Sequence, residues 1–256
     1  MTLRCKLCLT GTFLLTASLP GLAETPANDR AEPRPKITIL VYDYAGVTAE
    51  TQQGAEKVAT QILATAGVQT AWPDCSLAEL LEQPECNRAS NPTKLVLRIL
   101  PGSKAARTGY HFRSSICGFT VQHEGVGEGY LATLFIDCIQ QTAENTGVAQ
   151  SLIMGHMVAH EIGHLLLPIQ GHFRRGIMRA KWGPRVWQRA SKKLVLFPGK
   201  QAELLRAGVL ARMRQQETAQ LAALASLELA APQARQPEGR PARTTKEYFN
   251  VQDGSE

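Results

Sequence analysis

The sequence predicts an α+β domain in which helices pack on a mixed, twisted sheet, followed by a C-terminal helix. One observation is that runs of β-branched and aromatic residues are interspersed with segments whose apolar residues recur at helical spacing. The other is that the 256 residues are 44% hydrophobic and 20% charged, an ordinary globular composition. This composition excludes a wholly disordered chain, collagen and a coiled-coil rod. The length suits one core, or one core with an appendage.

The first 23 residues are typical of a secretory signal peptide. Arg4 and Lys6 precede a mostly apolar stretch at 7–19, which is shorter than the roughly 20 residues that span a bilayer. Small residues precede a cleavage position after Ala23. We therefore expect an exported protein, secreted or periplasmic, with no stable membrane span once the signal is removed. The alternative interpretation is an N-terminal membrane anchor.

The polar, proline-containing residues 24–35 are expected to be a flexible lead-in to a domain at 36–196. A first helix is expected at 48–66, where Gly67 ends it, and a long helix at 147–167, where Pro168 follows. The expected strands, all short runs rich in β-forming residues, are 36–44, 68–72, 94–100 and 130–136.

The rest of the chain is less regular. Residues 103–128 resist assignment, and residues 186–197 suit either a helix or a strand. The C-terminal segment 197–230 is rich in strong helix formers from Gly199 onward. Residues 231–256 are polar, with proline and glycine, and are predicted to be a disordered tail.

Four cysteines follow the signal peptide: Cys75, Cys86, Cys117 and Cys138. Three pairings are possible, and an oxidising compartment favours disulfides over free thiols. We favour Cys75–Cys86 and Cys117–Cys138, because each pair closes a fairly short loop. A cysteine metal site is disfavoured because no CxxC spacing remains after the signal peptide.

The motif that carries chemistry is HEIGH at 160–164, late in the second predicted helix. His160 and His164 are four residues apart, so both imidazoles lie on one helix face, about 6 Å apart along the axis. They can reach one tetrahedral zinc ion. Glu161 projects about 100° around the helix, where it can bind a water on the open side of the metal. The alternative is a helix with two incidental histidines.

A third ligand is required, and His172 is the favoured candidate. It lies eight residues after His164, beyond a turn indicated by Pro168 and Gly171. The competing ligand is a glutamate on the late helix, Glu203 or Glu217, as in thermolysin-like zincins. His156 lies one helical turn before His160, and we expect it to bond a neighbouring group rather than the metal.

The sequence Gly176-Ile177-Met178 follows His172 closely. A histidine-ligand turn followed by a tight turn with methionine resembles the metzincin group of zinc peptidases, and poorly characterised secreted bacterial zincin-like proteins. The resemblance implies a zincin-like fold, with His160, His164 and His172 as ligands and Glu161 as general base. It implies that Met178 forms a hydrophobic floor under the metal; the alternative is an ordinary core methionine. The family spacing to the third ligand is two residues shorter.

The function that follows is a secreted zinc metallopeptidase that cleaves a peptide or protein substrate through a zinc-bound water, with Glu161 as general base. By resemblance, the substrate runs antiparallel to an edge strand above the metal helix. We expect that edge at Tyr130, Leu131, Ala132 and Thr133. The pocket beside the cleaved bond would be lined by residues 179–187, in which Arg179 would favour acidic or polar side chains.

Nucleic acid is not an expected partner. The formal charge is +6, and the basic dipeptides are too short to form a stripe. Two alternative functions stay open: a catalytically inactive zincin-like protein that binds metal or a partner, and a metal-free extracytoplasmic module whose late helix is the partner surface. The sequence does not indicate the oligomeric state.

Overall fold

The computed structural model describes residues 34–76, 84–86, 91–102, 117–121, 129–168 and 171–230, all within the unit Arg34–Glu256. The predicted signal peptide, the lead-in up to residue 33 and the tail from 231 lie outside the described residues. The other two of the six histidines, His111 and His123, also lie outside the described residues. None of the described helices is both long and apolar enough to cross a membrane.

The described residues form a mixed α+β fold with a five-stranded sheet of order β2-β1-β3-β5-β4. The four strands other than β4 run parallel to one another: β2, β1, β3 and β5. The strand β4 pairs antiparallel with β5 and forms one edge of the sheet. The strand bounds are Lys36–Asp43 for β1, Gln69–Ala71 for β2, Lys94–Leu100 for β3, Gly118–Val121 for β4 and Leu131–Phe135 for β5.

The strand predicted at 130–136 exists as β5, but the prediction that it is the substrate edge was wrong. β5 pairs with β3 on one side and β4 on the other. Ala132 and Thr133 are fully buried, and Thr133 Oγ1 accepts a hydrogen bond from Arg98. The edge is β4, a four-residue strand that the sequence analysis left unassigned because its run of β-forming residues is so short.

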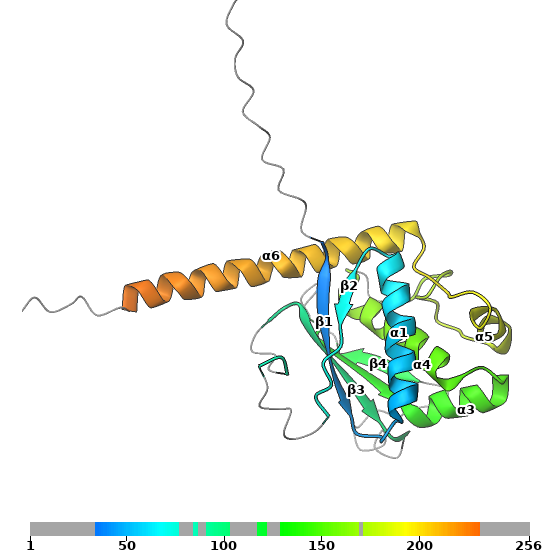
Figure 1. Cartoon of the computed structure of the whole chain (residues 1–256). Coiled ribbons are helices and arrows are strands. Elements are labelled where there is room, and N and C mark those ends of the chain that lie inside the picture. The colour runs from blue at the N-terminus through cyan, green and yellow to red at the C-terminus, as the bar shows by residue number, and fades with distance from the viewer. Residues whose placement is uncertain are drawn as a thin grey trace, which may run out of the picture. The chain divides into compact units, whose positions relative to one another are not determined.

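The helices α1 (Ala49–Thr65) and α4 (Gln150–Leu166) pack against each other and cover one face of the sheet (Figure 1). The main core lies between them and the inward side chains of the strands, such as Ile39, Leu97 and Leu134. Gly67 follows the end of α1, as predicted, and Thr48 caps its start. Thr48 Oγ1 accepts a hydrogen bond from the Thr51 backbone, and Gly67 follows with φ 82°.

Two shorter helices, α3 and α5, complete the described fold before the last helix. The helix α3 (Ile136–Thr146) follows β5 directly, and the sequence analysis did not assign it. The region 186–197, left open between helix and strand, contains most of α5 (Pro184–Ala190), which begins with a proline at its first turn. The remainder, up to Phe197, is irregular.

Both disulfides favoured from the sequence are present. Cys75–Cys86 closes a loop on the sheet face opposite α1 and α4, where both sulfurs pack with Leu40. Cys117–Cys138 joins the residue before β4 to α3. The second bridge therefore anchors the edge strand to the helix beside it.

The last helix, α6 (Gly199–Ala230), has the range predicted from its composition. Its first half packs on the domain through Leu205 and Val209, which are fully buried. Arg212 is also buried, and its guanidinium donates to the carbonyls of Pro92, Gly129 and Leu165. The second half leaves the domain surface: Leu221, Leu224 and Leu227 are 58–68% exposed.

Candidate metal centre

The HEIGH motif lies on the most buried helix of the described fold. Thirteen of the seventeen residues of α4 are buried, His160 and Glu161 among them. The helix contains no proline and ends where Leu167 turns extended before Pro168. Because His160 and His164 are one helical turn apart, they lie on one face of α4, and their Nε2 atoms are 3.1 Å apart.

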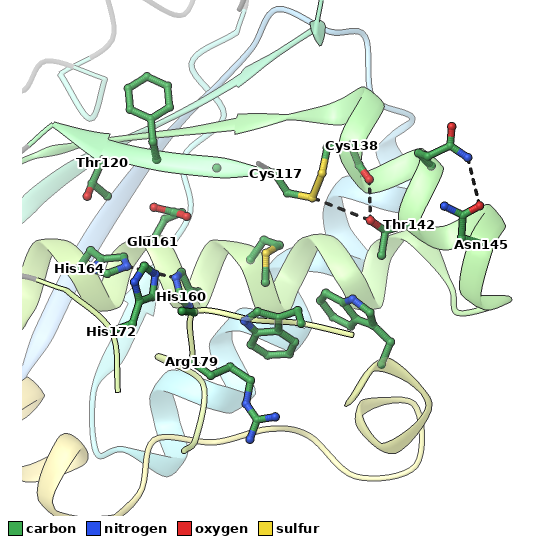
Figure 2. A pocket seen from close by; sticks show the side chains of 17 residues that line it. Cys117, Thr120, Cys138, Thr142, Asn145, His160, Glu161, His164, His172 and Arg179 are labelled. Atoms are coloured by element: carbon green, nitrogen blue, oxygen red, sulfur yellow. Dashed lines mark hydrogen bonds between the residues drawn. A yellow bond between two sulfur atoms is a disulfide. The ribbon is translucent and has the colours of Figure 1, made fainter. Parts of the chain in front are cut away.

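The loop after α4 brings His172 to the same place. Its ring centroid lies 5.2 Å from that of His160 and 4.8 Å from that of His164. One ligand atom from each histidine lies within 4.8 Å of the others, so the three can hold one metal ion. Figure 2 shows the three imidazoles converging at one end of the cleft. His160 is buried, His164 is partly exposed and His172 is exposed, so the group is open to solvent on one side.

A backbone carbonyl sets the orientation of His160. Its Nδ1 lies 2.8 Å from the carbonyl oxygen of Ile177. The carbonyl can only accept, so Nδ1 carries the proton and Nε2 keeps its lone pair for a metal. The Ile177 amide in turn donates to the Leu196 carbonyl. The loop that presents the acceptor is therefore itself held in place.

Met178 lies directly under the motif. It is fully buried, and a side chain at Gly163 would collide with its sulfur. Gly163 lies between His160 and His164 in the chain, so the missing side chain lets the methionine approach the helix beneath them. The loop itself is closed by the Phe173 amide donating to the Met178 carbonyl, and Gly176 adopts φ 79°.

Glu161 points away from the imidazoles and toward the edge strand. Figure 2 shows its carboxylate between α4 and the strand that carries Thr120. A Cβ at Gly118 of β4 would lie 2.8 Å from Glu161 Oε1, so only glycine leaves room for the carboxylate there. Burial raises the pKa of Glu161 to about 8. The carboxyl group is held between the helix and the strand, beside the histidines, where the positive charge of a bound metal ion would favour its ionised form.

Burial has the opposite effect on the two helix histidines. It lowers the pKa of His160 to about 4, although the Ile177 carbonyl opposes the shift. It lowers the pKa of His164 to about 3, with further lowering from His160 and His172. Both imidazoles are therefore neutral at pH 7, which is the form that binds metal ions.

The histidines open into a cleft of about 840 Å³. The edge strand β4 forms one wall, with Gly118, Phe119 and Thr120 lining the space. The remaining lining comes from α3, α4, α5 and the loop before α5, and includes the apolar Met157 together with polar and aromatic side chains: Gln141, Thr142, Asn145, Arg179, Trp182 and Trp187. An extended chain can therefore lie along β4 and pass the histidine group.

His156 has the supporting role expected for it. Its Nδ1 donates to the Leu152 carbonyl, and its Nε2 accepts from the Val195 amide. Both ring nitrogens are thus engaged, and the ring contacts Trp182 and Trp187 edge-on. Burial lowers the pKa of this imidazole. His156 fixes the segment around Val195 against α4 and takes no part in the histidine group.

The structure brings together the three histidines favoured as ligands and leaves the competing glutamates out. Both Glu203 and Glu217 lie on α6, and neither belongs to the potential metal-binding group found among the described residues. Three residues of the site were not predicted from the sequence. Gly118 leaves room for Glu161, and Gln141 and Asn145 line the cleft. The only signal for β4 was the run Gly-Phe-Thr-Val after Cys117. The amides of α3 carry no motif at all.

Comparison with known proteins adds no relative. No protein-family model matches the chain, and no curated sequence matches it. The functional argument therefore rests on the geometry of the site.

Proposed function

We propose that the protein is a zincin-like, zinc-dependent metallopeptidase. One observation carries the proposal: three imidazoles meet at the end of an open cleft, with a buried glutamate side chain beside them. Three protein ligands and an open side are typical of catalytic zinc, whereas structural zinc sites are closed by four.

The donor set fits zinc. For bonds of about 2.0–2.1 Å at tetrahedral angles, nitrogen ligands lie about 3.3 Å apart, and the His160 and His164 Nε2 atoms are 3.1 Å apart. Imidazole also binds copper, iron and nickel, but the absence of redox chemistry in zinc suits hydrolysis. Zinc would polarise the scissile carbonyl and lower the pKa of a water.

The role of the chain's own residues follows from their placement. Glu161 lies next to the ligands on the helix but faces β4, so its carboxylate is beside the path of a substrate and is not itself a ligand. It would accept the proton of the attacking water and deliver it to the leaving amine. Met178 would support the ligands from below, because it packs against the helix between them.

A peptide would bind along β4 by adding a strand to the sheet. Among the described strands, β4 has β5 as its only neighbour, and β4 lines the cleft, so a peptide that adds a strand there would pass the histidines. The Cys117–Cys138 bridge would hold this strand in position. Two disulfides are compatible with an extracellular protein, and we propose that the mature enzyme is exported.

The decisive experiment compares wild type with Glu161→Gln in digests of a diverse peptide library, read by mass spectrometry, with and without a chelator. We expect zinc content near one per chain in both proteins, cleavage only by wild type, and no cleavage after chelation. Loss of a general base lowers turnover by about 10²–10⁴-fold. Glu203→Gln, the same change at an exposed position of α6, is the matched control and should cleave normally.

Two results would contradict the proposal. Undiminished cleavage by Glu161→Gln would remove this residue from the reaction. Zinc-loaded wild type that cleaves no peptide would favour the alternative of a metal-binding protein without peptidase activity.

A further inference from the structure

The segment that follows the metal ligands is basic throughout. Residues 171–200 contain nine lysines and arginines and no acidic residue. The formal charge of the whole chain is +6, so the rest of the chain is net negative. The nine basic residues are Arg174, Arg175, Arg179, Lys181, Arg185, Arg189, Lys192, Lys193 and Lys200.

Folding gathers four of these cations around one hollow. The hollow has a volume of about 340 Å³, and its apolar lining comes from Val186, Leu194 and Val195. The cations around it are Arg179, Arg189, Lys192 and Lys193. We refer to these four residues and their hollow as the basic hollow.

The basic hollow adjoins the metal cleft, because Arg179 lines both. Figure 2 shows Arg179 below the histidine group, with Glu161 above it. The Arg179 Nε donates to the Gly176 carbonyl, which ties its side chain to the loop that carries Met178. A chain that passes the histidines can therefore place its next side chains against the cations.

No carboxylate of the described residues forms an ion pair with these four side chains. Arg189, Lys192 and Lys193 are exposed, and Arg179 is partly so. Clustered like charges repel and cost free energy in the compact state. A hollow with apolar lining and cations around it suits short side chains that end in a carboxylate.

We propose that the basic hollow binds acidic side chains of a polypeptide whose backbone crosses the metal cleft, so that the enzyme selects acidic peptides. The predicted selectivity of cleavage rests on the proposed peptidase function, whereas the predicted binding does not. A peptide is favoured over a nucleic acid or an anionic membrane because Arg179 joins the cations to a cleft lined by the edge strand β4, whereas a polyanion surface needs a broad basic face.

Binding tests the proposal without hydrolysis. The probe is a fluorescent twelve-residue peptide of alternating Glu and Ala, compared with its Gln–Ala counterpart, on zinc-loaded Glu161→Gln protein. The hollow variant adds Arg189→Glu, Lys192→Glu and Lys193→Glu. The matched control adds the same charge change at Lys36, Lys57 and Arg214, which are exposed and lie outside the basic segment.

We expect fluorescence anisotropy to show tighter binding of the Glu–Ala peptide than of the Gln–Ala peptide. We expect the hollow variant to weaken Glu–Ala binding by about tenfold or more, since three surface charge pairs are lost, and the control to leave it unchanged. In wild-type digests, cleavage sites with Glu or Asp nearby should lose their preference in the hollow variant alone.

Equal binding of the two peptides, or equal loss in the hollow and control variants, would overturn the proposal. So would a hollow variant that loses binding to anionic vesicles or to a DNA oligomer while its peptide binding is intact. Selective binding of the Glu–Ala peptide without any cleavage by wild type would keep this proposal and refute the peptidase.

Discussion

Two helices of the described fold, α4 and α6, differ in what surrounds them. The seventeen residues of α4 lie between the sheet, α1 and the loop that carries Met178, and thirteen are buried. The thirty-two residues of α6 bury only five among those whose side chains are described, all of them up to Arg212. The packing of α4 along its whole length fixes the histidines that it carries, whereas only the first half of α6 packs on the domain.

The largest effect is expected from removing a ligand on α4. His160→Ala leaves two imidazoles and should lower zinc affinity by about a hundredfold or more, since even the partners of ligands contribute 10–100-fold. His172→Ala should do the same. Zinc content after dialysis against a weak chelator measures both, and Glu203→Gln on α6 should keep its metal. Undiminished zinc binding by His172→Ala would point to a different third ligand.

The close packing of α4 can be tested at Gly155. A Cβ there would lie 2.6 Å from the Ala55 carbonyl oxygen of α1, so a side chain forces the two helices apart. We expect Gly155→Val to lower the free energy of unfolding by about 3 kcal/mol, a typical cost of overpacking. Gly199→Val at the exposed start of α6, where a Cβ has no neighbour within 4 Å, is the control. Equal losses in the free energy of unfolding for Gly155→Val and Gly199→Val, measured with urea, would contradict the closer packing of α4.

His156 tests how α4 is joined to the segment around Val195. His156→Phe keeps an aromatic ring but removes the acceptor of the Val195 amide, at a cost of about 2 kcal/mol.

The same substitution changes the pH dependence of stability. Burial lowers the pKa of His156 in the folded protein, so the unfolded chain binds a proton more readily once the pH falls below about 6.5. The wild type therefore loses stability through this group on acidification, and the phenylalanine variant does not. The difference in the free energy of unfolding between wild type and His156→Phe should therefore narrow from pH 7 to pH 5. Urea unfolding in the presence of a chelator measures it. A constant difference would show that His156 does not titrate with unfolding.

The smallest effect is expected from shortening α6. A chain that ends after Gln216 keeps the Thr93–Gln216 hydrogen bond and removes residues that are exposed up to 227. We expect the free energy of unfolding to change by no more than about 0.5 kcal/mol, as for other surface changes, with zinc content and cleavage unaltered. A large loss in thermal unfolding experiments would show that the outer half of α6 contributes to the stability of the fold.

The features that the sequence predicted correctly depend on residues near one another in the chain. The spacing of His160 and His164 places both on one helix face whatever surrounds them, and Gly67 ends α1 because glycine accepts a positive φ. The two disulfides close short loops, so proximity in sequence favoured the observed pairs. Hydrophobic runs located β1, β3 and β5 within one or two residues.

The features that needed the tertiary structure depend on partners far apart in the chain. Strand order is set by long-range pairing, so the short run at 118–121, not the longer one at 130–136, is the edge above the metal helix. The room that Gly118 leaves for Glu161 and the meeting of four cations beside the cleft are likewise set by packing. Local chemistry thus determined which side chains could bind a metal. Burial and strand pairing, which no local pattern encodes, decided where a substrate could lie against them.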